Sequence, residues 1–159
     1  MPKLLETKIW VLVMKNSKYS ELSIFNKSIV SQMIDMALDV SSKMLEKENA
    51  FYPFALSCDA HRKFKIIGLD GHLLNDTNKS VIFLREVLNR DLNEKSSIAA
   101  SLIYDVIAHN AVDKYKTDAI CIDMRIEDTF FNRFLYPYKS CKDKIEYGSP
   151  WAEFVDYLF

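Results

Sequence analysis

Apolar residues that recur at steps of three and four mark a long helix in the first third of the chain. They are Leu22, Phe25, Ile29, Met33, Met36, Val40 and Met44, and polar or charged residues fill the positions between them. This spacing predicts an amphipathic helix whose apolar stripe faces a core. Ser20 or Ser23 suits the N-cap position, and the period changes after Asn49, where we expect the helix to end.

The next apolar runs have the character of strands. Residues 51–58 and 64–69, separated by a polar turn, predict a hairpin. Pro53 cannot donate a ladder hydrogen bond, which places it near a strand start or on an edge. Asp70-Gly71 is a turn signal, and Asp76 or Thr77 suits the N-cap of a second helix over about residues 79–92.

The second half of the chain contains an array of strand-like runs. They cover residues 99–109, 118–128 and 131–139, with a shorter run at 144–148. In the second run, Ile120, Ile122, Met124 and Ile126 alternate with Cys121, Asp123, Arg125 and Glu127. Such alternation is typical of an antiparallel strand with one packed face and one wet face.

The C-terminus favours a short amphipathic helix over residues 149–159. Ser149 suits the N-cap and Pro150 the first helical position, and Trp151, Phe154, Val155 and Leu158 then follow at helical spacing. The predicted fold is therefore α+β in the order α-β-β-α-β-β-β. We expect an antiparallel sheet of about five strands with both long helices on one face. Residues 1–159 form one domain, with residues 1–19 as an N-terminal lead-in.

This element order resembles the roadblock, longin and profilin-like scaffolds, which mostly serve protein–protein contact. Short motifs also resemble a group of small, largely uncharacterised bacterial α+β proteins. The motifs are AFYPFAL (50–56), IYDVIAH (103–109), TDAICIDM (117–124), LYPYK (135–139) and IEYG (145–148). Neither resemblance implies an activity for any of these residues.

Composition and charge narrow the classes of partner. Hydrophobic residues make up 49% of the chain and aromatic residues 13%, as expected for a globular core. The 21 basic and 22 acidic residues are interspersed, for a net charge of −1, without the basic surface that nucleic-acid binding requires. We expect no membrane partner, because the apolar run at residues 9–14 is too short to span a bilayer. Three cysteines without a CxxC pair favour reduced thiols and a cytoplasmic location.

The nearest approach to a reactive site is Cys58 with His61. Residues three apart in a turn seldom reach the geometry that nucleophilic chemistry requires, and a packed thiol beside a solvated turn is the preferred interpretation. Only His72 and His109 could add further imidazole ligands, so we expect no metal and no cofactor.

A polar surface on the sheet is the remaining candidate site. We expect Asp105, His109, Cys121, Asp123, Arg125 and Arg133 to share the wet face, either as cross-strand charge pairs or as a ligand site. With the aromatic C-terminus, the candidate binding surface comprises Asp105, His109, Asp123, Arg125, Arg133, Trp151, Phe154 and Tyr157.

Three hypotheses of function follow, and the preferred one assigns no catalytic residue. The preferred one is a non-enzymatic module that binds another protein or itself, as a homodimer or in a complex. An immunity-type or antitoxin-type protein is one concrete version. The alternatives are a small-molecule sensor with its ligand between sheet and helices, and a hydrolase or transferase that uses Cys58 or Cys121.

Overall fold

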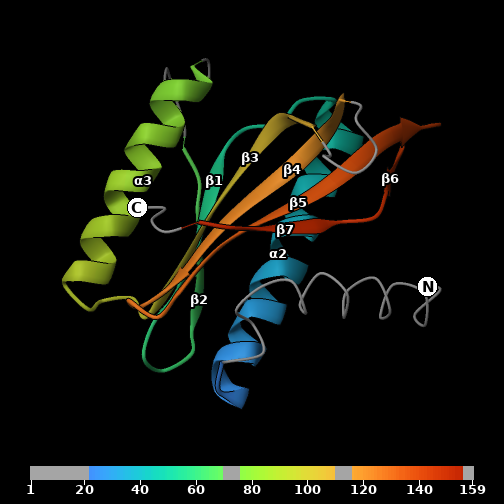
Figure 1. Ribbon diagram of the computed structural model, residues 1–159. Helices are drawn as coiled ribbons and strands as arrows, with labels where there is room; N and C mark the ends of the chain where they lie inside the picture. The colour runs from blue at the N-terminus through green and yellow to red at the C-terminus, as the bar shows by residue number, and fades with distance from the viewer. Residues whose placement is uncertain (1–21, 70–75, 110–115, 156–159) are drawn as a thin grey trace.

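A seven-stranded antiparallel sheet lies between two helices in the computed structural model, which describes residues 22–69, 76–109 and 116–155 (Figure 1). The helices are α2 (Ile24–Glu48) and α3 (Thr77–Asn93). The strands are β1 (Phe54–Cys58), β2 (Phe64–Ile67), β3 (Ala99–His109), β4 (Lys116–Ile126), β5 (Phe130–Cys141), β6 (Lys144–Tyr147) and β7 (Trp151–Phe154). Their order is β2-β1-β3-β4-β5-β6, and β7 pairs with β5. The α+β class and the antiparallel sheet are as predicted.

Helix α2 begins and ends where its sequence indicates. The Ser23 hydroxyl accepts a hydrogen bond from the Asn26 amide at 3.2 Å, and Asn49 closes the helix in the left-handed conformation with φ 48°. The residues of its buried side are Ile29, Val30, Met33, Ile34, Ala37 and Ser41. Phe25, expected in this stripe, is instead exposed, and the Arg62 guanidinium lies 4.1 Å from its ring centroid.

The main core lies between α2 and one face of the sheet. Ile120, Ile122, Met124 and Ile126 of β4 all point into it and are fully buried, as the alternation predicted. Phe130 and Phe134 of β5 join them. At its C-terminal end α2 is fastened to β6, because the Tyr147 hydroxyl lies 2.7 Å from the Ser42 hydroxyl and Glu46 accepts from the Ile145 amide.

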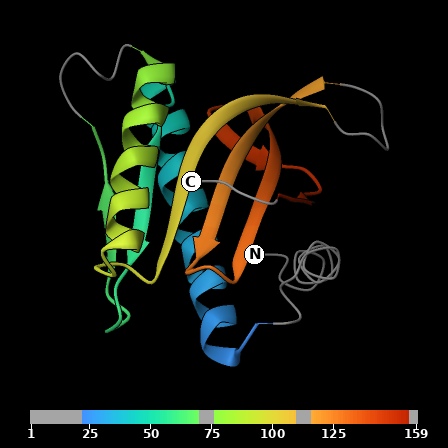
Figure 2. The ribbon, with the colours of Figure 1, turned by 60° about the vertical axis from the view of Figure 1, so that its left-hand side comes forward.

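Helix α3 covers the opposite face, so the prediction of both helices on one face is wrong. Leu84, Leu88 and Leu92 of α3 pack against Ala55, Ala100 and Leu102, whose neighbours along β1 and β3 point toward α2 (Figure 2). The physical reason is connectivity. Strands β2 and β3 both pair antiparallel with β1, so α3 links two parallel strands, and sheet twist fixes the side on which such a crossover lies. No such constraint acts on α2, which covers the other apolar face.

The predicted C-terminal helix is also wrong, because Trp151–Phe154 form β7. Trp151 lies opposite Leu135, and Phe154 lies opposite Asn132. The edge of β5 offers ladder hydrogen bonds to this aromatic-rich segment. Pairing with β5 therefore outweighs the local preference for a helix that the spacing of four apolar residues indicated. With β6, this strand raises the sheet from about five strands to seven.

Several other predictions can be placed. Pro53 directly precedes β1, and Asp76 caps α3 by accepting from the Lys79 amide at 3.0 Å. The lead-in at residues 1–19, the Asp70-Gly71 turn and Tyr157 lie outside the described residues.

Candidate functional site: a buried carboxylate held by three strands

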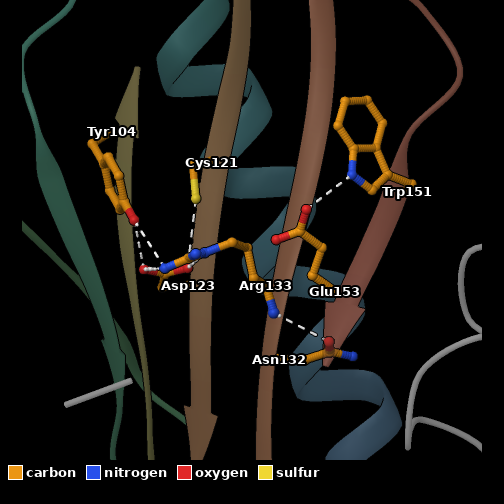
Figure 3. Close-up of polar contacts among 7 residues, drawn as sticks. All are labelled: Tyr104, Cys121, Asp123, Asn132, Arg133, Trp151 and Glu153. Carbon is orange, nitrogen blue, oxygen red and sulfur yellow. Dashed lines mark hydrogen bonds and ion pairs between the residues drawn. The ribbon is translucent and has the colours of Figure 1, made fainter. Parts of the chain in front are cut away.

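The strand register brings four polar side chains together on the α3 side of the sheet. Asp123 of β4 lies opposite Arg133 of β5, and Tyr104 of β3 lies opposite Cys121 of β4. Since side chains two residues apart share a face, Cys121 and Asp123 point the same way. We refer to Tyr104, Cys121, Asp123 and Arg133 as the carboxylate cluster (Figure 3).

Both oxygens of the Asp123 carboxylate accept hydrogen bonds from other side chains of the protein. Arg133 binds it in a fork, with Nε 2.7 Å from Oδ1 and Nη2 3.2 Å from Oδ2. The Tyr104 hydroxyl donates to Oδ2 at 2.7 Å, and the Cys121 thiol donates to Oδ1 at 3.5 Å. Asp123 is fully buried, whereas the Arg133 side chain keeps 30% of its surface exposed. The buried charge is therefore compensated by a bidentate partner that reaches the surface.

The cluster keeps the Cys121 thiol and the Tyr104 hydroxyl in their protonated forms. Burial, reinforced by the charge of Asp123, raises the pKa of the Cys121 thiol well above its usual range. Burial is also the main reason that the pKa of Tyr104 is raised. The hydrogen bond to Asp123 raises the pKa of Arg133. A protonated thiol is a poor nucleophile, so Cys121 is not activated for covalent chemistry.

The sequence predicted a wet face here, and that prediction is wrong. Cys121, Asp123 and Arg125 are all buried, and Glu127 alone of the four alternating residues is exposed. The sheet packs on both faces at these positions, and hydrogen bonds within the protein replace those to water.

Arg125 lies on the same face but serves a different contact. Its Nε donates to the Glu127 carbonyl at 2.7 Å, and its Nη2 lies 2.7 Å from Asp128 Oδ1. Nη1 donates to Asn89 of α3 at 3.4 Å. Arg125 thus joins the β4–β5 turn to α3, and these contacts stabilise the fold.

Asp105 and His109 lie on the α2 side, away from the carboxylate cluster. Asp105 is opposite Ile120, and His109 is opposite Lys116 at the end of β3. The Tyr138 hydroxyl donates to Asp105 at 3.0 Å. Although Asp105 keeps contact with water, the surrounding protein removes enough hydration to raise the pKa of its carboxyl.

At the C-terminus, β7 adds two side chains beside the cluster. The Trp151 indole donates to Glu153 at 3.4 Å, and Glu153 lies opposite Arg133 in the register (Figure 3). Phe154 is the last residue of β7 and pairs with Asn132 in the backbone register, and its side chain lies outside the described part of the structure. Of the eight residues of the candidate binding surface, the structure brings Asp123 and Arg133 into contact.

The Cys58 and His61 pair does not form a reactive site. Cys58 is fully buried, its thiol donates to the Asp59 carbonyl at 3.5 Å, and burial raises its pKa. His61 is exposed in a turn that Asp59 organises by accepting from the His61 and Lys63 amides. This agrees with a packed thiol beside a solvated turn.

Several buried polar atoms between α2 and the sheet have no hydrogen-bond partner within the described part of the chain. They are Ser41 Oγ, Ser101 Oγ, Asn132 Nδ2 and Tyr136 Oη. Ser101 and Asn132 flank Met124 in one cross-strand row. Unpaired buried polar groups are costly, so water or a ligand at these atoms would lower the free energy of the folded state.

Sequence reasoning missed Tyr104, the hydroxyl partner of Asp123. It assigned Asp105 to the face of Asp123 instead. The face shared by two strands depends on the hairpin register, in which Asp105 meets Ile120 and odd residues of β3 meet even residues of β4. The length of the connection does not fix this parity, so the sequence carries no signal for it.

No family model, curated protein or solved structure matches this chain. Within residues 22–69, 76–109 and 116–155, no helix is long and apolar enough to cross a membrane. In the same ranges, no three His, Cys, Asp or Glu side chains form a group that could hold a metal ion.

Proposed function

We propose that this protein is a non-enzymatic binding module that recognises another protein through the outer side of α3. The supporting observation is a pair of large apolar side chains there. Ile82 is 56% exposed and Phe83 is 43% exposed. They differ from the buried residues of α3 that face the sheet, which are Ser80, Leu84, Leu88 and Leu92.

The surroundings of this pair resemble a small protein-recognition surface. Lys79 and Glu86 are exposed one turn before and one turn after it, so charged groups border an apolar centre. Apolar and aromatic residues at the centre of an interface, with a polar rim, supply most of the binding free energy. We refer to Lys79, Ile82, Phe83 and Glu86 as the α3 surface.

The carboxylate cluster supports binding over catalysis. Asp123 is inaccessible and its oxygens are occupied by Tyr104, Cys121 and Arg133. A general acid or base must reach the proton that it transfers, and a nucleophile must be activated. Neither condition is met by these four residues.

The experiment compares the wild type with Phe83→Ala and with Ile66→Ala as a matched control. Ile66 is an apolar residue of similar exposure on β2, away from α3. Proteins captured from lysate of the source cells are identified, purified and titrated by calorimetry. We expect Phe83→Ala to weaken the purified complex about tenfold or more and Ile66→Ala to leave it unchanged. Equal affinities for the three forms would contradict the α3 surface as the binding site.

A toxin is one concrete partner, in which case this chain acts as an immunity-type or antitoxin-type protein. The size of the chain and its net charge of −1 suit this role. The complex would then suppress an enzymatic or lytic activity of the captured protein. A captured partner whose activity is the same with and without this chain would exclude this version.

The second candidate is a small-molecule sensor, supported by Ser41, Ser101, Asn132 and Tyr136. Their unpaired polar atoms lie between α2 and the sheet, where a sensor would hold its ligand. A crystal structure in which only ordered water contacts these atoms would exclude this candidate.

A further inference from the structure

Part of one edge of β3 is unpaired among the described residues, and this edge is separate from the α3 surface. The ladder between β1 and β3 ends at the pair Phe54 and Ile103. Pro53 comes next, and its missing N–H ends the pairing. Strand β3 continues through Tyr104–His109, paired with β4 on its other edge, and curves away past the end of β1 (Figure 2). Among the described residues, no strand pairs with this edge of Tyr104–His109.

The side chains along this edge have a self-complementary order. Ile107 is at the centre, and its side chain is 73% exposed. Asp105 precedes it by two residues and His109 follows it by two, and both are exposed on the same side of the sheet. Val106 and Ala108 alternate with them on the other side.

We propose that a second copy of this chain docks here, pairing β3 with β3 antiparallel about a two-fold axis at Ile107. In this register Ile107 faces Ile107 of the second copy. Asp105 of each copy faces His109 of the other, so the pairing contains two carboxylate–imidazole contacts. Val106 faces Ala108, again twice. Five residues of each copy then form one ladder along an edge that no other described strand pairs with.

The pairing of a carboxylate with an imidazole selects this register among the neighbouring ones. A two-fold axis perpendicular to the sheet keeps the two faces matched, so the alternatives are centred on Val106 or Ala108. In either of these, Asp105 no longer faces His109. Only the register centred on Ile107 covers the exposed isoleucine with its counterpart and places both Asp105 carboxylates opposite His109 imidazoles. Hydrogen-bonding partners directly across antiparallel strands are stabilising, and like charges are destabilising.

The interface is small, so we expect a dimer that dissociates on dilution. Its tests use the full chain, with mass measured by sedimentation velocity over a concentration series. The wild type is expected to move from monomer to dimer as concentration rises. Ile107→Lys places two like charges on the axis and should leave only monomer. Ile82→Lys, a change of the same kind on α3, should leave the dimer intact.

Charge variants test the register. His109→Asp sets aspartates opposite one another and should raise the dissociation constant about tenfold or more. Adding Asp105→His exchanges the two side chains, so that each aspartate again faces a histidine, and should restore dimerisation. A double variant as weak as His109→Asp alone would contradict the register, provided that its circular dichroism and melting temperature match those of the wild type.

Cross-linking keeps the proposal testable if a charge variant is unstable. Ile107→Cys, in a Cys141→Ser background that removes the exposed native thiol, should form a disulfide between two copies under a mild oxidant. Ile82→Cys in the same background should not. A wild type that stays monomeric throughout, or a dimer insensitive to Ile107→Lys, would overturn the proposal and leave the α3 surface unaffected.

Discussion

Asp123 shows what a single residue needs in order to be charged inside a sheet. Its carboxylate depends on Arg133 for the compensating charge and on Tyr104 and Cys121 for two further hydrogen bonds. Removing one partner of a buried ion pair costs more than the pair itself contributes, because the remaining charge is left without a partner.

Arg133→Met is therefore expected to lower the free energy of unfolding by about 3 kcal/mol. Adding Asp123→Asn removes the stranded charge and should recover part of that loss. Urea unfolding of the wild type, the two single variants and the double variant measures the coupling. A loss below about 0.5 kcal/mol for Arg133→Met, the range of an ordinary surface substitution, would contradict a compensating role for Arg133.

At the scale of elements, α2 shows that an apolar residue in a helix is not always buried. Ile34 is buried between α2 and the sheet, whereas Ile24, in the first turn of the same helix, is almost fully exposed. Large-to-small substitutions are costly where a cavity is left behind and cheap where water already surrounds the side chain.

Ile34→Ala should lower the free energy of unfolding by about 2–5 kcal/mol, and Ile24→Ala should change it by less than about 0.5 kcal/mol. Both are Ile→Ala in one helix, so differences in helix propensity cancel. Thermal and urea unfolding measure both variants. Similar losses for the two would contradict the orientation of α2.

Sequence patterns predicted the elements better than their arrangement. The caps at Ser23 and Asp76 and the inward set from Ile120 to Ile126 follow from local chemistry, and each is confirmed. The side on which α3 lies depends on strand order, and the strand state of Trp151–Phe154 depends on a free edge of β5. Both depend on how distant segments of the chain pack together. The carboxylate cluster needed the β3–β4 register, which local sequence does not encode.

For the molecule as a whole, four tyrosines make stability depend on pH in the alkaline range. Burial is the largest cause of the raised pKa of Tyr104, Tyr136, Tyr138 and Tyr147. In the unfolded chain a tyrosine loses its proton near pH 10. Above that pH the unfolded state has released protons that the folded state retains, so the stability present at lower pH is lost as the pH rises.

The free energy of unfolding should therefore be flat near neutral pH and fall by about 1 kcal/mol or more per pH unit above about pH 10. Tyr136→Phe is the matched variant, because the Tyr136 hydroxyl is buried and no described residue forms a hydrogen bond with it. It should flatten the alkaline fall without lowering stability at pH 7. Urea unfolding from pH 7 to 11 tests this, and an unchanged slope in the variant would contradict a buried, protonated Tyr136.

The attachment of α2 to the last third of the chain has a consequence for synthesis. Glu46 and Ser42 meet Ile145 and Tyr147, about a hundred residues further on, and the apolar side of α2 rests on β4 and β5. During translation this helix leaves the ribosome long before the strands that shelter it. The apolar side of α2 is therefore exposed during most of the elongation of the nascent chain. We expect ribosome-associated chaperones to bind α2 until β5 and β6 have emerged.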